Sequence, residues 1–378
     1  MNIEILGYAE DLRTHTHVVY AKMLINHYLE LVGKDFDQFD IQRRREKHKA
    51  YNRLKQDVLA GALLPSITLA IRMEKVDTLL PLVKERNNNF LSEALATPGQ
   101  VTILDGLQRT FLLNELTEEG QPFQPSQTVL LEFWFEKDIR NLIYRIIVLN
   151  AGQKPMSMRH QLELLFLTVK DRLQTEIPGL EIFMEREGNR RTKSRKYPLD
   201  RIATSYQCFI TKTPEVQREN LVAQKMVEED ALASSEQELG EQFDSYKEYL
   251  VIYANLDDDI CRIYPGSHNT EIPSGTNWFG SDNVMNSFFA AVADYGTTLA
   301  RQDRVNKACY RLSERLSSAH PGEDPLGLEK LQQLISGFNT RKVNVGFATR
   351  KLITTGFKEY FRAEGDVTLE KCWMEAVD

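Results

Sequence analysis

The residue types best suited to chemistry gather in residues 101–116, VTILDGLQRTFLLNEL. Residues 101–105 are typical of a strand and the remainder of a helix. Asp105 and Gly106 therefore lie at the corner, and Gln108 and Arg109 open the helix. A helix N-terminus offers unpaired backbone N–H groups and the positive end of the helix dipole. A glycine there lets a ligand approach the backbone, and the combination favours a phosphate group.

Each polar side chain at this corner has a chemical interpretation and a plain one. Arg109 supplies a planar fork of donors suited to phosphate oxygens. Gln108 can hold a water molecule or a nucleobase, and Asp105 can bind a metal ion or orient Arg109. The plain interpretation is that Asp-Gly forms a common turn and that an arginine in a first helical turn is solvated.

The segments on either side of the corner form an ordered set. YNRLKQDVLAGALLPSITLAI places a helix, a glycine, a proline and a strand before it, and VLNAGQKPMSMRHQLELL follows it. This order resembles the ParB/sulfiredoxin-like superfamily, in particular its DGQQR and DGQHR branches. The second box of that family matches Asp105 to Arg109, and the third matches residues 149–163. Leu107 stands where the family has its first glutamine, and the resemblance covers about residues 40–165.

The resemblance implies a small mixed α/β core that binds a nucleoside triphosphate, with Mg²⁺, or a nucleic acid phosphate. Members of the family hydrolyse nucleotides, nick DNA or act as DNA-binding switches, and the two branches often occur in DNA-modification and phage-defence systems. The candidate catalytic residues are Asp105, Gln108 and Arg109, and the candidate nucleotide-binding residues are Gly106, Arg109, Asn150 and Gln153. For Asn150 and the following Gly152, a plain helix C-cap is the alternative.

Two dense basic clusters occur in an otherwise acidic chain of formal net charge −7. A global basic field for nucleic acid is therefore absent, and any such contact must come from local patches. The first cluster lies in IQRRREKHKAYNRLK and the second in REGNRRTKSRKYPLDR. Charge runs usually mark solvated faces, but each cluster can also neutralise several phosphates. The second is predicted to be a flexible basic loop, with candidate nucleic-acid-binding residues Arg190, Arg191, Lys193, Arg195 and Lys196.

The remaining candidates for metal or redox chemistry are weak. The four cysteines form no CxxC pair, which indicates buried reduced thiols in a cytosolic protein. One His160–Glu163 pair on a predicted helix favours a surface or core pair over a metal site. The acids of NLDDDIC would point in different directions on a helix, which favours a solvated helix start. No GxxxxGK[ST] segment occurs, so a P-loop nucleotidase is not supported.

Trp278 and Phe279 belong to a long segment, YPGSHNTEIPSGTNWFGSD, that is predicted to be a functional loop. Their rings can stack on a nucleobase or pack beneath the loop.

Hydrophobic periodicity predicts the elements that must position these residues. Helices are expected at 17–31, 42–60, 107–116, 139–150 and 158–173, and strands at 66–72, 101–104 and 128–136. Residues 73–100 are interpreted as an insertion of helical pieces, and the chain after residue 198 as almost entirely helical.

These patterns predict an α+β protein. A ParB-like nucleotide-binding domain is expected at residues 1–165, and a mainly helical domain for nucleic acid or partner contacts at 166–378. No signal peptide or transmembrane segment is expected, which indicates a cytoplasmic protein.

The leading hypothesis is a nucleotide-dependent, DNA-associated protein of a DNA-modification or antiviral-defence system. Whether it hydrolyses the nucleotide stays open, and its expected partners are DNA, a nucleotide, and a second copy or other proteins of the same system. The alternatives are a non-catalytic DNA-binding regulator of transcription or assembly and a ParB-like DNA nickase.

Overall fold

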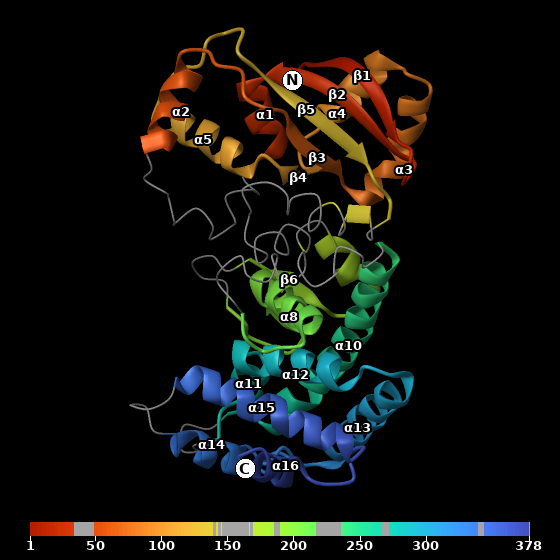
Figure 1. Ribbon diagram of the computed structural model, residues 1–378, viewed down its shortest axis with the longest axis vertical. Helices are drawn as coiled ribbons and strands as arrows, with labels where there is room; N and C mark the ends of the chain where they lie inside the picture. The colour runs from red at the N-terminus through yellow and green to blue at the C-terminus, as the bar shows by residue number, and fades with distance from the viewer. Residues whose placement is uncertain are drawn as a thin grey trace. The chain divides into compact units, whose positions relative to one another are not determined.

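The computed structural model describes residues 1–33, 49–138, 141–142, 145, 166, 169–184, 190–216, 236–266, 272–338 and 344–377. The chain divides into two compact units, Met1–Ile146 and Ile147–Asp378. The first contains a five-stranded mixed sheet and the second is mostly helical, so the α+β class predicted from the sequence is confirmed (Figure 1). The boundary expected after residue 165 lies further along the chain than this division.

The sheet of the first unit has the strand order β1-β2-β5-β3-β4. Only β3 and β5 are parallel, and the other neighbours are antiparallel. A parallel pair requires a long crossover, which residues 72–127 supply. The strands are β1 (Ile3–Asp11), β2 (Thr16–Leu24), β3 (Ile67–Ile71), β4 (Val101–Asp105) and β5 (Thr128–Phe135). The last three confirm the strands predicted from the sequence.

The predicted helix at 17–31 is wrong in its first half. Residues 16–24 form β2, which pairs with β1 on one side and β5 on the other. Val19, Ala21 and Met23 are buried at a spacing of two, the period of a strand. The apolar positions of this segment fit both periods, and the two neighbouring strands decide between them. Only the second half is helical, as α1 (Ile25–Val32).

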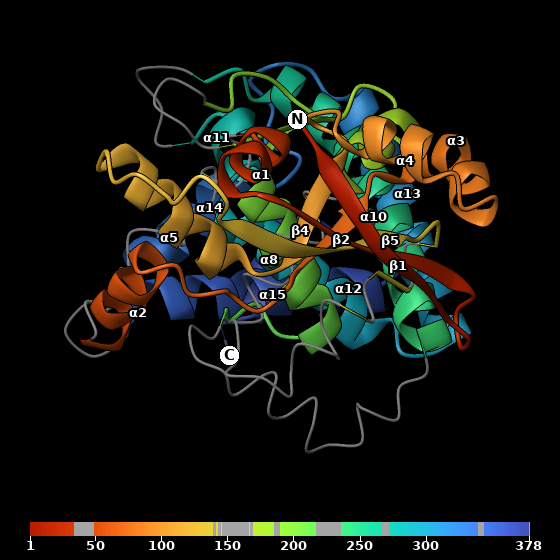
Figure 2. The same cartoon turned by 90° about the horizontal axis from the view of Figure 1, so that it is seen from above.

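Among the residues that the structure describes, five helices with defined ends accompany the sheet. They are α1, α2 (Lys49–Leu59), α3 (Met73–Lys84), α4 (Asn88–Leu95) and α5 (Leu107–Glu118). The predicted helical pieces between residues 73 and 100 are confirmed as α3 and α4. Helix α1 contacts β2, β4 and β5 (Figure 2). Its Tyr28 and Leu31 are completely buried. Lys55 of α2 forms ion pairs with Glu115 of α5 and with Glu119, which caps the end of α5, and so ties these two helices together.

In the second unit, helix α12 lies between α8 and α15 (Figure 1). The strands are β6 (Glu181–Phe183) and β7 (Lys196–Pro198). The helices are α8 (Leu199–Thr211), α10 (Glu236–Ile263), α11 (Gly275–Phe279), α12 (Asp282–Tyr295), α13 (Leu299–Ser318), α14 (Leu328–Ser336), α15 (Val345–Arg362) and α16 (Leu369–Glu375). Its core is aromatic: Tyr246 and Phe289, for example, pack with ring centroids 4.8 Å apart.

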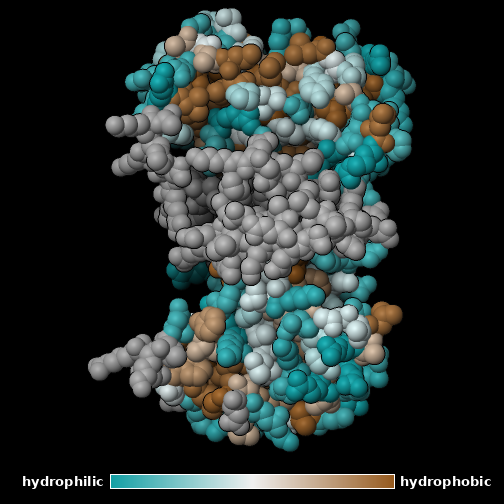
Figure 3. Space-filling view, in the orientation of Figure 1, coloured by the Kyte–Doolittle hydropathy of each residue, from teal (hydrophilic) through white to brown (hydrophobic). Residues whose placement is uncertain are grey.

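Polar residues are distributed over the drawn face of the second unit, with apolar residues between them (Figure 3). Within the described ranges, no helix is both long enough and apolar enough to cross a membrane.

Candidate phosphate-binding corner

Gly106 forms the turn between β4 and α5. Its backbone is left-handed, with φ +100° and ψ 10°, a conformation that costs side-chain-bearing residues free energy. A Cβ atom added here would also lie 3.0 Å from the side chain of Ile67. Both the turn and the close packing therefore require glycine, and α5 begins directly after it.

Arg109 is held in place by two hydrogen bonds. Nη2 donates to Oδ2 of Asp105 at 2.7 Å, and Nη1 donates to the backbone carbonyl of Ser66 at 2.6 Å. The sequence left two roles for Asp105, metal ligand or orienting group, and in this structure it orients Arg109. The side chains remain accessible, at 18% for Arg109 and 32% for Asp105. The guanidinium is thus fixed in direction while its outer side stays open.

A second carboxylate belongs to the same network. The Ser66 hydroxyl donates to Oε1 of Glu132 at 2.5 Å. In the sheet, Thr68 pairs with Asp105 on one side and with Glu132 on the other, so the carboxylates lie on strands separated by one strand. With the residues that the structure describes, the second oxygen of each carboxylate makes no hydrogen bond.

The charges of this network determine which anion it can accept. The network contains one guanidinium and two carboxylates, so a bare polyphosphate would meet a net negative charge. Carboxylate oxygens are the ligands that Mg²⁺ prefers, and Mg²⁺ is usually held by one or two carboxylates together with substrate phosphates. Asp105 and Glu132 fit this pattern. The corner therefore suits a phosphate group that arrives with a divalent cation.

The side chains of Thr110 and Tyr28 anchor the start of α5. The Thr110 hydroxyl donates to the Gly106 carbonyl at 3.1 Å and shares a 2.6 Å hydrogen bond with the Tyr28 hydroxyl. Both side chains are completely buried. Burial raises the pKa of Tyr28 well above its usual value, so its hydroxyl stays neutral. These contacts fix the helix N-terminus, and hence the direction of its N–H groups, against α1.

The other residues of the motif differ in exposure. Gln108 is exposed, and its backbone N–H, like those of Leu107 and Arg109, precedes the first helical hydrogen bond, from Thr110 to Gly106. The Leu107 side chain is only 3% exposed. Leu107 therefore points into the core and does not face the open side of the corner. Asn150 and Gln153 lie outside the described residues.

In its described part, residues 190–201, the second basic cluster is not the flexible loop predicted from the sequence. Arg191 is only 8% exposed, and its Nη2 donates to Oδ1 of Asp257 at 2.5 Å. Its other nitrogens donate to the backbone carbonyls of Thr276 and Lys196 at 2.8 and 2.9 Å. The guanidinium also lies over the Tyr197 ring. Arg191 therefore holds segments of the second unit together.

Three further cations of this cluster have partners too. Arg195 donates to Asp258 at 2.6 Å and to Asn255 at 2.6 Å. Lys193 and Lys196 both form ion pairs with Glu181. Arg190 is exposed, and within the described residues it has no ion pair. The sequence could not reveal these partners, because most are distant along the chain.

The acids of NLDDDIC do not form a solvated helix start. They lie near the C-terminal end of α10, and Asp257 is completely buried. Besides Arg191, it accepts hydrogen bonds from the Arg195 N–H at 2.8 Å and the Tyr197 hydroxyl at 2.5 Å. A buried charge requires hydrogen bonds and an opposite charge nearby, and here residues of the basic cluster provide both.

The aromatic pair of the long segment is packed inside the second unit. Trp278 and Phe279 are 6% and 1% exposed, and Phe279 stacks on Tyr253 with centroids 4.0 Å apart. Packing, rather than stacking on a ligand, is confirmed for this pair.

All four cysteines are free, and the predicted burial is confirmed for Cys208, Cys309 and Cys372.

Sequence reasoning missed the residues that complete the corner: Ser66, Glu132, Tyr28 and Thr110. One signal was available, because Glu132 is the only charged residue within the otherwise apolar strand TVLLEFWF. In the part of the chain that is described, no three His, Cys, Asp or Glu side chains gather as a metal site.

The chain was compared with protein-family models, with curated proteins and with solved structures, and none of the three comparisons gave a match.

Proposed function

We propose that the corner formed by Asp105, Gly106 and Arg109 binds the phosphates of a nucleoside triphosphate together with Mg²⁺. The observation that carries this proposal is the fixed but accessible guanidinium of Arg109, oriented by Asp105 beside the N-terminus of α5. Backbone N–H groups and an arginine fork together favour phosphate oxygens. Asp105 and Glu132 supply the oxygen ligands for the cation.

The wider role that we propose is a nucleotide-dependent, DNA-associated protein of a DNA-modification or antiviral-defence system. This step rests on the resemblance of the Asp105–Arg109 motif and its flanking boxes to the DGQQR and DGQHR branches. The second basic cluster does not support a DNA-associated role, because the side chains of Arg191 and Arg195 are held within the fold.

If the protein hydrolyses the nucleotide, Gln108 would be the residue that orients a water molecule. Its side chain is exposed and lies one residue from Arg109. Phosphoryl transfer depends mainly on charge neutralisation and an oriented nucleophile, which Arg109 and Gln108 would supply. A DNA-binding regulator that binds nucleotide without turnover is the second candidate, and it uses the same corner.

Calorimetric titration of the full chain with ATP and Mg²⁺ tests the binding step. Arg109→Ala should weaken affinity at least roughly tenfold, because a charge-assisted contact contributes about 1.5–3 kcal/mol. Arg86→Ala is the matched control, since Arg86 is an exposed arginine of the same unit that lies outside both basic clusters. Chelation of Mg²⁺ should also weaken binding. Unchanged affinity in Arg109→Ala would exclude this site.

Steady-state phosphate release, with and without duplex DNA, separates the two candidates. A hydrolase should lose turnover in Gln108→Ala while its nucleotide affinity is retained, because the amide would act on the transition state. A regulator should bind nucleotide tightly and release no phosphate above background.

A further inference from the structure

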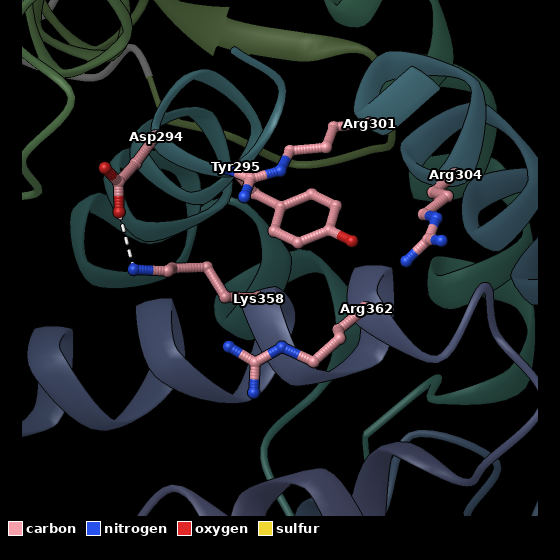
Figure 4. Close-up of a pocket in the computed structure, with 6 residues that line it drawn as sticks. All are labelled: Asp294, Tyr295, Arg301, Arg304, Lys358 and Arg362. Carbon is pink, nitrogen blue, oxygen red and sulfur yellow. Dashed lines mark hydrogen bonds and ion pairs between the residues drawn. The ribbon is translucent and has the colours of Figure 1, made fainter. Parts of the chain in front are cut away.

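The second unit contains a basic pocket of about 460 Å³ where α12, α13 and α15 meet. Its lining residues are Asp294, Tyr295, Arg301, Arg304, Lys358 and Arg362 (Figure 4). Four cations and one carboxylate leave three net positive charges on this lining, although the whole chain is acidic. The volume is typical of a small-molecule site.

Helix α13 contributes two of these cations at an electrostatically unfavourable place. Arg301 lies in its first turn and Arg304 one turn later, and this first turn has no acidic residue. Cations near a helix N-terminus oppose the helix dipole, whereas an anion there is stabilised. The arrangement thus concentrates positive charge from two sources, the side chains and the start of the helix.

Arg301 has the least compensation of the four cations. Its Nη1 donates to the Thr297 hydroxyl at 3.3 Å, and its guanidinium lies 5.6 Å from the centre of the Tyr295 ring. Among the described residues, no carboxylate lies within ion-pair distance of it. The aromatic ring and the hydroxyl position the guanidinium without neutralising it.

The other three cations each have one carboxylate partner. These pairs are Lys358–Asp294 at 2.5 Å, Arg362–Glu359 at 2.7 Å and Arg304–Glu364 at 3.4 Å. Glu359 and Glu364 do not line the pocket but lie beside it. An extended polyanion such as DNA would also meet Glu359 and Glu364 and be repelled, whereas a compact anion inside the pocket would meet four cations and the single lining carboxylate of Asp294.

We propose that this pocket binds a compact, multiply phosphorylated small molecule. Three guanidinium groups offer planar donor forks to phosphate oxygens, and the Lys358 ammonium adds a point charge. Free polyphosphate and the phosphate tail of a nucleotide share this chemistry. The site is independent of the corner at Arg109, because all of its residues belong to the second unit.

Calorimetric titration of the full chain with inorganic tripolyphosphate, at low salt and with EDTA, tests the proposal. The double variant Arg301→Gln/Arg304→Gln should bind at least about tenfold more weakly than wild type. Lys351→Gln removes one exposed cation of α15 outside the lining and should bind like wild type. Arg109→Ala should also bind like wild type, which distinguishes this site from the corner.

Competition then identifies the source of the phosphates. Displacement of tripolyphosphate by ATP, but not by AMP, assigns the pocket to the tail of a nucleotide. If ATP does not displace tripolyphosphate, the pocket is assigned to free polyphosphate. Absence of tripolyphosphate binding, or equal binding by wild type and the double variant, would overturn the proposal. A nucleic acid site would also overturn the proposal: in that case duplex DNA binds wild type but not the double variant, and tripolyphosphate binds neither protein.

Thermal unfolding shows whether the two arginines serve the ligand or the fold. Tripolyphosphate should raise the Tm of wild type and leave the Tm of the double variant unchanged. Without anion, the double variant should melt no lower than wild type, because both arginines oppose the dipole of α13. A large loss of Tm without anion would mean that they hold the structure together, and the proposal would fail.

Discussion

Two arginine–aspartate pairs, one in each unit, have similar geometry and different surroundings. Nη2 of Arg109 donates to Asp105 at 2.7 Å, and Nη2 of Arg191 donates to Asp257 at 2.5 Å. The first pair is 18% and 32% exposed, whereas the second is 8% and 0% exposed. Both arginines come from segments that the sequence marked as candidates for phosphate binding.

The two pairs differ in how many hydrogen bonds their aspartates accept. Asp257 also accepts the Arg195 N–H and the Tyr197 hydroxyl, so the buried charges are surrounded by partners. A charge removed from water requires this, because an unpaired one would cost several kcal/mol. Asp105 accepts one hydrogen bond from Arg109, its side chain is 32% exposed, and its Oδ1 makes no hydrogen bond with the residues that the structure describes. A satisfied pair stabilises the fold, and a half-open pair is able to bind a ligand.

The largest expected effect is on the buried pair. Asp257→Ala should lower the free energy of unfolding by about 3–5 kcal/mol, because it leaves Arg191 charged and buried without its partner. Urea denaturation measures this. The neighbouring Asp258→Ala is the control, since Asp258 forms a partly exposed pair with Arg195 and should cost less than about 1 kcal/mol. Equal losses in both variants would contradict the buried network.

The next effect concerns the turn that creates the open corner. Gly106→Ala should cost about 2 kcal/mol, because it combines left-handed backbone strain with a contact to Ile67. Gly120→Ala, beyond the other end of α5, has φ +68° and open space around it, so only strain of about 1 kcal/mol applies. Chemical denaturation of both variants compares them. If Gly106→Ala and Gly120→Ala lose the same stability, the contact between the added Cβ atom and Ile67 does not contribute to the loss.

A smaller change in stability is expected at the half-open pair itself. Arg109→Ala should lower the free energy of unfolding by about 1 kcal/mol, because its ion pair is partly solvated. Arg191→Ala should lower it by at least about 3 kcal/mol. The same denaturation series measures both. A large loss in Arg109→Ala would show that this arginine also supports the fold and would weaken the contrast between the pairs.

The smallest effect is on the reactivity of a thiol beside the buried pair. Burial, followed by the charge of Asp257, raises the pKa of Cys261 to about 11. Alkylation at pH 8 should therefore be slow and should accelerate roughly tenfold per pH unit towards pH 11, because the thiolate is the reactive form. Mass spectrometry of iodoacetamide-treated protein measures the rate at this residue.

Removal of the neighbouring charge gives the matching comparison. Asp257→Asn should lower the pKa of Cys261 and speed its labelling at pH 8, because a negative charge no longer disfavours the thiolate. Cys309 is buried, at 4% exposure, and burial raises its pKa to about 12, so its continued resistance to labelling shows that the variant is folded. Equal labelling of Cys261 in wild type and variant would mean that burial alone protects it.

Local patterns predicted much of the fold and part of the site. The strands at residues 67–71, 101–105 and 128–135, and the helix after Gly106, follow from short-range apolar spacing and the Asp-Gly turn. At residues 16–24 the prediction of a helix is wrong, because the apolar positions suit both a helix and a strand and the neighbouring strands select the strand. The roles of Ser66 and Glu132 were missed, since their contacts join residues 66 positions apart.

The sequence by itself determined that Asp105, Gly106 and Arg109 meet at a strand-to-helix corner, because adjacent residues in a turn cannot separate. Only the tertiary structure decided which basic residues remain available. Arg191 and Asp257 are 66 positions apart, and burial of one beside the other becomes favourable only once α10 is packed in place. Charge composition records how many cations the chain has, whereas packing determines which of them are already neutralised.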